Sequence, residues 1–429
     1  MNSRLTKNSL WMILARFAAQ GLAVIFTILL ARQLGSDGFG AYAFIAALLF
    51  VANALTTFGT DMLLIREIAA KDDLSAKDDL SGLPGALAIQ LALSFALIAL
   101  VWIFGAWIPN QGQETVTALK VYSLTLIPLA FFSVFTTALR GKQLMAVYAL
   151  LNIVVSLLQV GVVLMLRETT LVILSAFLLS VQIIAAVFAA LLCSFAIPRF
   201  WHSWQFSSFP LSSFLKATAP IAALALLTML YQRLGVTMLS LMTTPGETGI
   251  FSAAARMIEA SKTAHIAVFA ALYPAMAQGM RHWSSRVASS ATDRDPPITI
   301  RFLIAGAIII ALLLFALARF LVTLLYGVEF AASTGVLQIL AWSLIPFTIN
   351  TYLTLSFLVS KQEYLIGRAL AVSLLGMLIL NLWWIPARGP EGAAWASLIA
   401  ECLQSISLLV SARSFALVQG EAHEFSQLS

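Results

Sequence analysis

The chain has 429 residues, of which 61% are hydrophobic and only 10% are charged. A soluble globular chain carries about a quarter charged residues, so this composition excludes an ordinary soluble enzyme or binding domain. The formal charge of +6 does not indicate a nucleic-acid partner, because most Lys and Arg lie in short segments on one side of the predicted spans, a bias typical of membrane topology.

Apolar runs of about 20 residues recur along the whole chain, and each is long enough to cross a bilayer as a helix. They predict an all-α polytopic membrane protein with twelve transmembrane helices, at residues 9–32, 39–60, 84–107, 116–138, 145–166, 171–195, 214–241, 249–279, 300–326, 335–359, 363–385 and 391–413. The first run is too long for a signal peptide, so we expect a retained helix. The distribution of Lys and Arg places both termini in the cytoplasm.

An internal repeat divides the twelve spans into two halves. Short segments match between the halves at residues 127–128 and 345–346, at 141–143 and 360–362, and at 35–40 and 245–249. The repeat predicts an N-terminal six-helix lobe at 1–195, a cytoplasmic interfacial linker at 196–213, and a C-terminal six-helix lobe at 214–429 with a short cytoplasmic tail. Because six is even, the lobes should be parallel repeats related by a pseudo-two-fold axis along the membrane normal.

Ionisable residues inside the spans are the candidate functional residues, because each costs about 2.5–3.5 kcal/mol in lipid and usually faces a polar cavity. The span 249–279 carries Arg256, Glu259, Lys262 and His265. Three-residue spacing lets Glu259 pair with Arg256 or with Lys262. Such pairing leaves net positive charge on this face and predicts a cationic cavity. A purely structural pair of Arg256 with Glu259 is the alternative.

Two further spans carry polar candidates. Arg16 and Gln20 lie one turn apart in the first span, and Gln232 and Arg233 lie in the seventh. Arg16 either faces the cavity or extends to the cytoplasmic headgroups. We expect Arg233 and Arg256 at similar depth on neighbouring antiparallel helices, where two guanidiniums suit a phosphate or carboxylate.

Asp61 and His265 are the candidates for ion or proton coupling, although simple hydrogen bonding explains each of them as well, with a helix end or Arg66 as the partner of Asp61. We expect no catalytic residue, metal site or cofactor, since the four histidines lack metal-ligand spacing and no phosphate-binding loop or dinucleotide fingerprint occurs. Cys193 and Cys402 lie in apolar segments of different halves, so core packing is their expected role.

Short motifs along nearly the whole chain resemble those of one family. They lie at residues 30–35 with 38–42, 58–61 with 65–69, 249–251 with 255–259, 325–327 with Phe330, and Gly389 with 392–394. These stretches are similar to the bacterial polysaccharide flippases, which carry lipid-linked oligosaccharides of the O-antigen and exopolysaccharide type. That family belongs to the multidrug/oligosaccharidyl-lipid/polysaccharide exporter superfamily.

The resemblance implies a two-lobe fold whose central cavity opens alternately to each side of the bacterial inner (plasma) membrane. The substrate would be an undecaprenyl-diphosphate-linked oligosaccharide, moved from the cytoplasmic to the periplasmic leaflet. Basic cavity residues, here Arg16, Arg233, Arg256 and Lys262, would attract the diphosphate, and Arg256 has the best motif support. Membrane lipid, a polysaccharide polymerase and assembly proteins would be the partners.

Three other functions fit parts of the sequence. A drug/cation antiporter of the multidrug and toxin extrusion type shares the fold but needs acidic cavity groups, and the first span contains no Asp or Glu. A lipid-II flippase usually has two additional helices. A membrane enzyme such as a polymerase or ligase would need a large periplasmic loop, which the spacing of the predicted spans does not leave.

Overall fold

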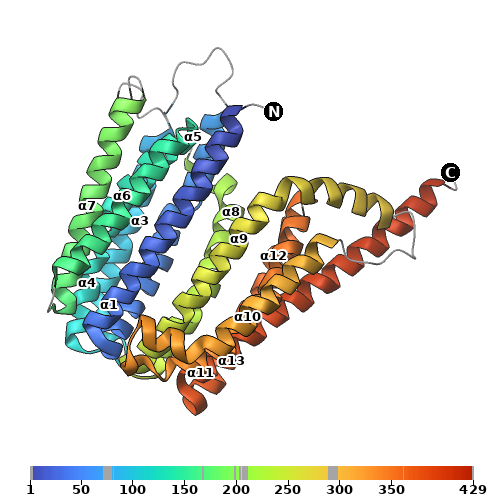
Figure 1. The fold of residues 1–429 in the computed structure, drawn as a ribbon. Helices are drawn as coiled ribbons and strands as arrows, with labels where there is room; N and C mark the ends of the chain where they lie inside the picture. The colour runs from blue at the N-terminus through green and yellow to red at the C-terminus, as the bar shows by residue number, and fades with distance from the viewer. Residues whose placement is uncertain are drawn as a thin grey trace. The chain divides into compact units, whose positions relative to one another are not determined.

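The computed structural model describes residues 3–70, 80, 82–166, 169–197, 200–201, 204, 211–287, 298–360 and 362–427. Every regular element in these ranges is a helix (Figure 1). The chain forms two compact units, Met1–Gly249 and Ile250–Ser429, and each is described by itself. The chain is therefore the all-α membrane protein that its apolar runs predict.

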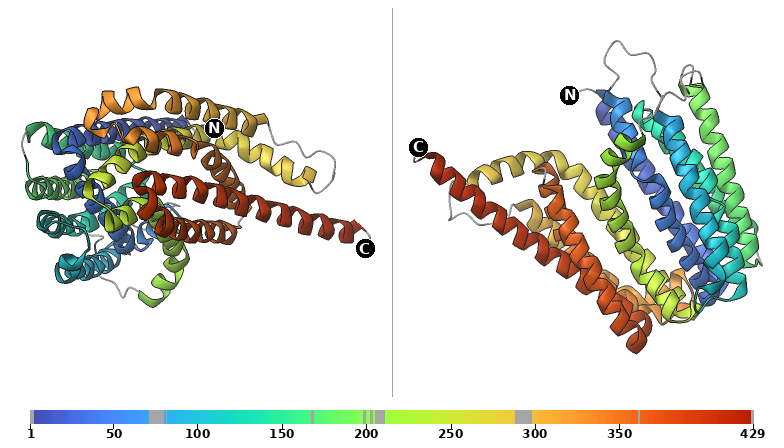
Figure 2. Two further views of the ribbon diagram at one scale, coloured as in Figure 1. Left: turned by 90° about the horizontal axis from the view of Figure 1, so that it is seen from below. Right: turned by 180° about the vertical axis from the view of Figure 1, so that it is seen from behind.

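Unit 1 is built around the long helix α1. Its elements are α1 (Ser3–Thr57), α2 (Thr60–Ala70), α3 (Gly82–Phe104), α4 (Gln113–Ser123), α5 (Leu126–Gly141), α6 (Met145–Met165), α7 (Leu171–Ala196), α8 (Leu211–Met242) and the first turn of α9 (Pro245–Val287). Helix α1 packs against α3, α5, α6 and α8, and α7 packs against α4, α5 and α6 (Figures 1 and 2). Apolar residues from α2, α3, α5, α6 and α7 form a buried cluster in this unit.

Unit 2 contains the rest of α9 together with α10 (Ile298–Leu325), α11 (Ser333–Ala341), α12 (Leu344–Val359) and α13 (Glu363–Gln427). Helix α12 packs along α13, and α10 packs against α11 and α12. Helix α11 also contacts α13. The α12–α13 interface includes the buried carboxylate of Glu401, which is described below.

The helices account for the twelve predicted spans. The spans correspond to the two arms of α1, then α3, α4 with α5, α6, α7, α8, α9, α10, α11 with α12, and the two arms of α13. Among the described residues, eight helices are long and apolar enough to cross a membrane, or nine if the bent pair α11–α12 is one span. That number counts α1 and α13 once each and leaves out the more polar α9.

Two glycines divide α1 and α13 into their arms. Gly35 has φ 66° and Gly389 has φ 53°. Positive φ is a conformation that glycine adopts at little cost and that other residues rarely adopt. The bends at these two glycines explain why α1 and α13 each correspond to two predicted spans.

Two prolines break helices at equivalent places in the repeat. Helix α4 stops before Leu124 and α5 resumes ahead of Pro128, while α11 stops before Trp342 and α12 resumes ahead of Pro346. A proline ring clashes with the carbonyl four residues earlier, which is Leu124 in the first case and Trp342 in the second. The matching breaks agree with the internal repeat read from the sequence.

Two equivalent glycines of the repeat also touch each other within unit 1. A Cβ added to Gly40 would lie 1.7 Å from the backbone oxygen of Pro245, and one added to Gly249 would lie 2.0 Å from the backbone oxygen of Ser36. Only glycine allows backbones to approach this closely. The reciprocal contact brings the start of α9 against the second arm of α1.

Unit 1 includes α8, which the sequence analysis assigned to the C-terminal lobe at 214–429. Helix α8 packs on α1, and the exposed turn before α4 is fastened to its end. There the side chain of Asn110 donates to the Leu241 carbonyl at 2.7 Å, and Gln111 donates to the Ser240 carbonyl at 2.9 Å. The lobe boundaries at 195 and 214 remain predictions from the repeat.

Candidate functional site

A partly buried ion pair joins helices α9 and α13 within unit 2. The ammonium of Lys262 lies 2.5 Å from Oε1 of Glu401, and Nζ also lies 4.7 Å from the centre of the Phe347 ring on α12. The side chain of Glu401 is only 6% exposed, whereas that of Lys262 is 23% exposed. The carboxylate is therefore the enclosed partner, and the ammonium is the partner that can be reached from outside the helix interface.

Two neutral side chains hold the carboxylate in place. Nδ2 of Asn350 donates to Oε2 of Glu401 at 2.9 Å and to the Glu401 backbone oxygen at 3.1 Å. Oγ of Ser405, one turn further along α13, donates to Oδ1 of Asn350 at 2.7 Å. All three residues are buried, so both carboxylate oxygens have partners.

This geometry makes the pair costly to disturb. Removing one member of a buried ion pair typically costs about 3–5 kcal/mol, because it leaves an uncompensated charge. Replacing both members with apolar residues is often neutral. A loss of activity in a Lys262 variant thus cannot by itself identify Lys262 as a substrate contact.

Two further charged residues of α9, Arg256 and Glu259, pair with each other within the helix. Nη1 of Arg256 donates to Oε2 of Glu259 at 2.9 Å, with both side chains about one-third exposed. This confirms the first of the two pairings that the spacing allowed. The second was wrong, because Lys262 pairs with Glu401 instead of Glu259.

The pairing also corrects the predicted charge of this face. Arg256 and Lys262 supply two positive charges, and Glu259 and Glu401 supply two negative charges within contact distance. The charges of these four residues sum to zero, so the net positive charge predicted for this group is not found among them. The sequence analysis missed this because Glu401 is distant in sequence and only the fold brings it to Lys262.

In unit 1 the candidates lie on α1 and α8. The guanidinium of Arg233 stacks on the ring of Phe50 at 4.5 Å from its centre, which is a cation–π distance. Arg233 and Gln20 are half-buried, and Gln232 is exposed. The side chain of Arg16 lies outside the described residues. The depth of Arg233 relative to Arg256 stays a prediction, since they belong to different units.

The two coupling candidates have ordinary partners. Asp61 lies in the first turn of α2, at a helix end as one of the two predicted alternatives has it, and its carboxylate is 4.0 Å from the guanidinium of Arg140 on α5. His265 is buried, and its Nδ1 lies 3.0 Å from the Ser261 carbonyl in the same helix. These contacts explain both residues structurally, while their role in coupling stays untested.

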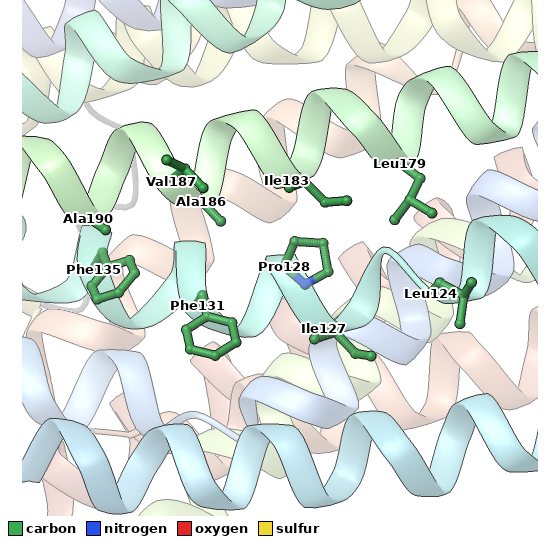
Figure 3. A pocket seen from close by; sticks show the side chains of 10 residues that line it. All are labelled: Leu124, Ile127, Pro128, Phe131, Phe135, Leu179, Ile183, Ala186, Val187 and Ala190. Atoms are coloured by element: carbon green, nitrogen blue, oxygen red, sulfur yellow. The ribbon is translucent and has the colours of Figure 1, made fainter.

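An apolar groove of about 550 Å³ lies between the break before α5 and helix α7 in unit 1 (Figure 3). Its lining consists of Leu124, Ile127, Pro128, Phe131, Phe135, Leu179, Ile183, Ala186, Val187 and Ala190. At one end, Phe135 packs against Phe200, Trp201 and Trp204 from the predicted interfacial linker. The groove contains no charged residue and belongs to the packing of unit 1.

Sequence reasoning missed Glu401, Asn350 and Ser405. A signal for Glu401 existed, because it is the sole Asp or Glu between residues 392 and 413, and a carboxylate inside an apolar span is a functional candidate by default. Asn350 and Ser405 carried no such signal, since short polar side chains are common in spans. Among the described residues, no cluster of three or more His, Cys, Asp or Glu could hold a metal.

Comparisons with known proteins agree on the fold. Residues 5–280 match the family described as "Polysaccharide biosynthesis protein". Two solved structures are similar at 14% identity. The lipid II flippase MurJ in an inward closed conformation has a TM-score of 0.78, covering 96% of this chain and 90% of that one. An inward-facing multidrug resistance MATE family transporter of the MOP superfamily has 0.72, covering 95% and 99%.

A third similar structure is a MOP superfamily transporter from Pyrococcus furiosus, with a TM-score of 0.63, 14% identity, and coverage of 96% of this chain and 97% of that one. That transporter is described as having a binding pocket of reverse polarity, which suggests a different function. No curated protein matches the sequence. At these identities the likenesses establish a shared fold, and pocket chemistry must be argued from this chain.

Proposed function

Because the chain belongs to the polysaccharide biosynthesis protein family, we propose that it is a flippase for an undecaprenyl-diphosphate-linked oligosaccharide. It moves this lipid from the cytoplasmic to the periplasmic leaflet by alternating access. The observation that carries the proposal is the placement of ionisable side chains in α8, a candidate membrane span, and in α9, which covers a predicted span, in a chain with this family and fold. Such residues usually face a polar cavity.

The physical problem is the charge of the headgroup. A diphosphate cannot cross hydrocarbon without compensation of several kcal/mol per charge. Guanidiniums suit this task because they stay protonated and donate to phosphate oxygens in pairs. We assign Arg233 and Arg256 as diphosphate contacts, and Gln20 and Gln232 as additional amide donors.

The other candidates have supporting roles in the proposal. Glu259 orients Arg256 through their 2.9 Å contact, and Arg16 adds positive charge from the first span. Lys262 is a further candidate contact, and in this structure it is paired with Glu401. The polyprenyl tail stays in lipid while the headgroup passes, and rocking of one repeat against the other switches access.

The setting follows from the same proposal. The protein lies in the bacterial inner membrane with both termini in the cytoplasm, as the distribution of Lys and Arg predicts. Its partners are the lipid-linked glycan, membrane lipid, and the polymerase and assembly proteins that act on the product. It works as a transporter without catalytic residues, cofactor or metal.

A drug/cation antiporter is the second candidate, and the buried carboxylate of Glu401 favours it. Antiport of a cation needs an acidic group inside the membrane, and the multidrug transporters share this fold at a TM-score of 0.72. Here, however, Lys262 already neutralises that carboxylate. A lipid-II flippase, similar at a TM-score of 0.78, differs from the main proposal only in its headgroup.

Leaflet accessibility in liposomes tests the proposal directly. A labelled undecaprenyl-diphosphate oligosaccharide is reconstituted with the protein, and an added glycosidase trims only outward-facing sugars. We expect the accessible fraction to rise well above half, and Arg256→Ala to slow the rise at least about tenfold through loss of a charge-assisted contact. Arg256→Lys should restore part of the rate without the paired hydrogen bonds.

Two variants control this experiment. Arg319→Gln removes an exposed arginine near the end of α10 and should transport like the wild type. Glu259→Gln removes the partner of Arg256 but keeps its guanidinium, so it should retain more activity than Arg256→Ala. An accessible fraction that stays near half, with uptake of a lipophilic cation instead, would establish the antiporter.

A further inference from the structure

Lys262 and Glu401 differ in how firmly each is held. Glu401 is fixed by Asn350, which is fixed in turn by Ser405, and its side chain is almost fully enclosed. Lys262 reaches the carboxylate with a long flexible side chain, is more exposed, and has the face of an aromatic ring as its other neighbour. Such an arrangement lets the ammonium leave while the carboxylate stays.

We propose that Glu401 is an internal anion that competes with the substrate's diphosphate for Lys262. In the resting protein the ammonium is bound to Glu401. When the anionic headgroup arrives, Lys262 turns from the carboxylate to a phosphate oxygen, and when the headgroup leaves, Glu401 takes the ammonium back. This inference rests on the proposed function and adds Glu401 to it as a positioning residue.

The competition has a physical purpose. A free ammonium inside the membrane is costly, and one bound to phosphate without a competitor would hold the headgroup too tightly to release it. An enclosed carboxylate at 2.5 Å satisfies the ammonium between cycles and lowers its net affinity for substrate. Affinity then comes from the other contacts of the headgroup, while Lys262 contributes a contact that can be reversed.

Glu401→Gln tests this exchange, because it removes the charge at nearly constant shape. The probe is labelled, sugar-free undecaprenyl diphosphate, bound to the full-length protein in detergent. We expect Glu401→Gln to bind it about tenfold more tightly than the wild type, which corresponds to about 1.4 kcal/mol, and to flip the glycolipid more slowly. The double variant Lys262→Met/Glu401→Gln should lose this gain in affinity.

Glu391→Gln is the matched control, since it makes the same change at an exposed position of the same helix and should bind like the wild type. Thermal unfolding in detergent reports whether each variant folds. If Glu401→Gln does not fold, Glu401→Asp draws the carboxylate back by one methylene and should tighten binding by a smaller factor.

The outcomes separate the two proposals. If the wild type flips the glycolipid but Glu401→Gln and the double variant bind the probe equally, the Lys262–Glu401 pair is structural. The exchange is then wrong, while the proposed function stands. The same holds if Glu401→Gln binds more weakly than the wild type. If the wild type neither binds the probe nor flips the glycolipid, both the proposed function and the exchange at Lys262 are wrong.

Discussion

The interface of α5 with α7 and that of α12 with α13 occupy equivalent places in the repeat but differ in chemistry. Helices α5 and α12 both begin just after a break that a proline causes, at Pro128 and Pro346. Between α5 and α7 lies a groove lined by apolar side chains, whereas Asn350 and Glu401 join α12 to α13 with a buried charge.

The two interfaces share their backbone breaks but differ in their side chains. Proline and glycine fix the backbone of both halves, because they act through sterics that depend little on neighbours. The side chains at the interface are free to diverge once the backbone is fixed. One interface then depends on apolar packing, and the other depends on a network that is stable only when every member is present.

Lys262→Ala should have the largest effect on stability, because it leaves the buried charge of Glu401 without its partner. We expect a loss of about 3–5 kcal/mol in the free energy of unfolding, measured by denaturant titration in detergent. The double variant Lys262→Leu/Glu401→Leu should recover most of this loss. A single variant as stable as the wild type would mean that solvent or lipid headgroups reach Glu401.

Gly40→Ala tests the close backbone contact between the two equivalent glycines of the repeat, Gly40 and Gly249. The new Cβ would lie 1.7 Å from the Pro245 backbone oxygen, and backbone cannot yield as a side chain can. We expect a loss of about 1–3 kcal/mol from overpacking, and a similar loss for Gly249→Ala. The control Gly161→Ala has no atom within 4 Å of the new Cβ and should not destabilise the protein.

Ala186→Leu should have the smallest effect on stability. It tests the apolar α5–α7 interface, as the Lys262 variant tests the polar network at Glu401. The larger side chain extends into the groove beside α5, where no polar partner is lost. We expect a change in unfolding free energy below about 1.5 kcal/mol and flipping at the wild-type rate. A severe loss of flipping with normal stability would instead show that the groove takes part in transport.

The sequence by itself determined the fold class, the twelve spans, and the family resemblance that the match over residues 5–280 confirms. Long apolar runs leave a bilayer helix as nearly the sole stable state, so local composition suffices. It also located Arg256 and its partner Glu259, because a contact at three-residue spacing is set by helix geometry alone.

The charge of the site depends on contacts between residues that only the folded chain brings together. Lys262 pairs with Glu401 across 139 residues of sequence, and Asn350 reaches Glu401 from a third helix. No periodicity encodes which helices lie side by side, since that depends on packing of the whole unit. The sequence therefore predicted a net cationic face, and the fold supplied the carboxylate that neutralises it.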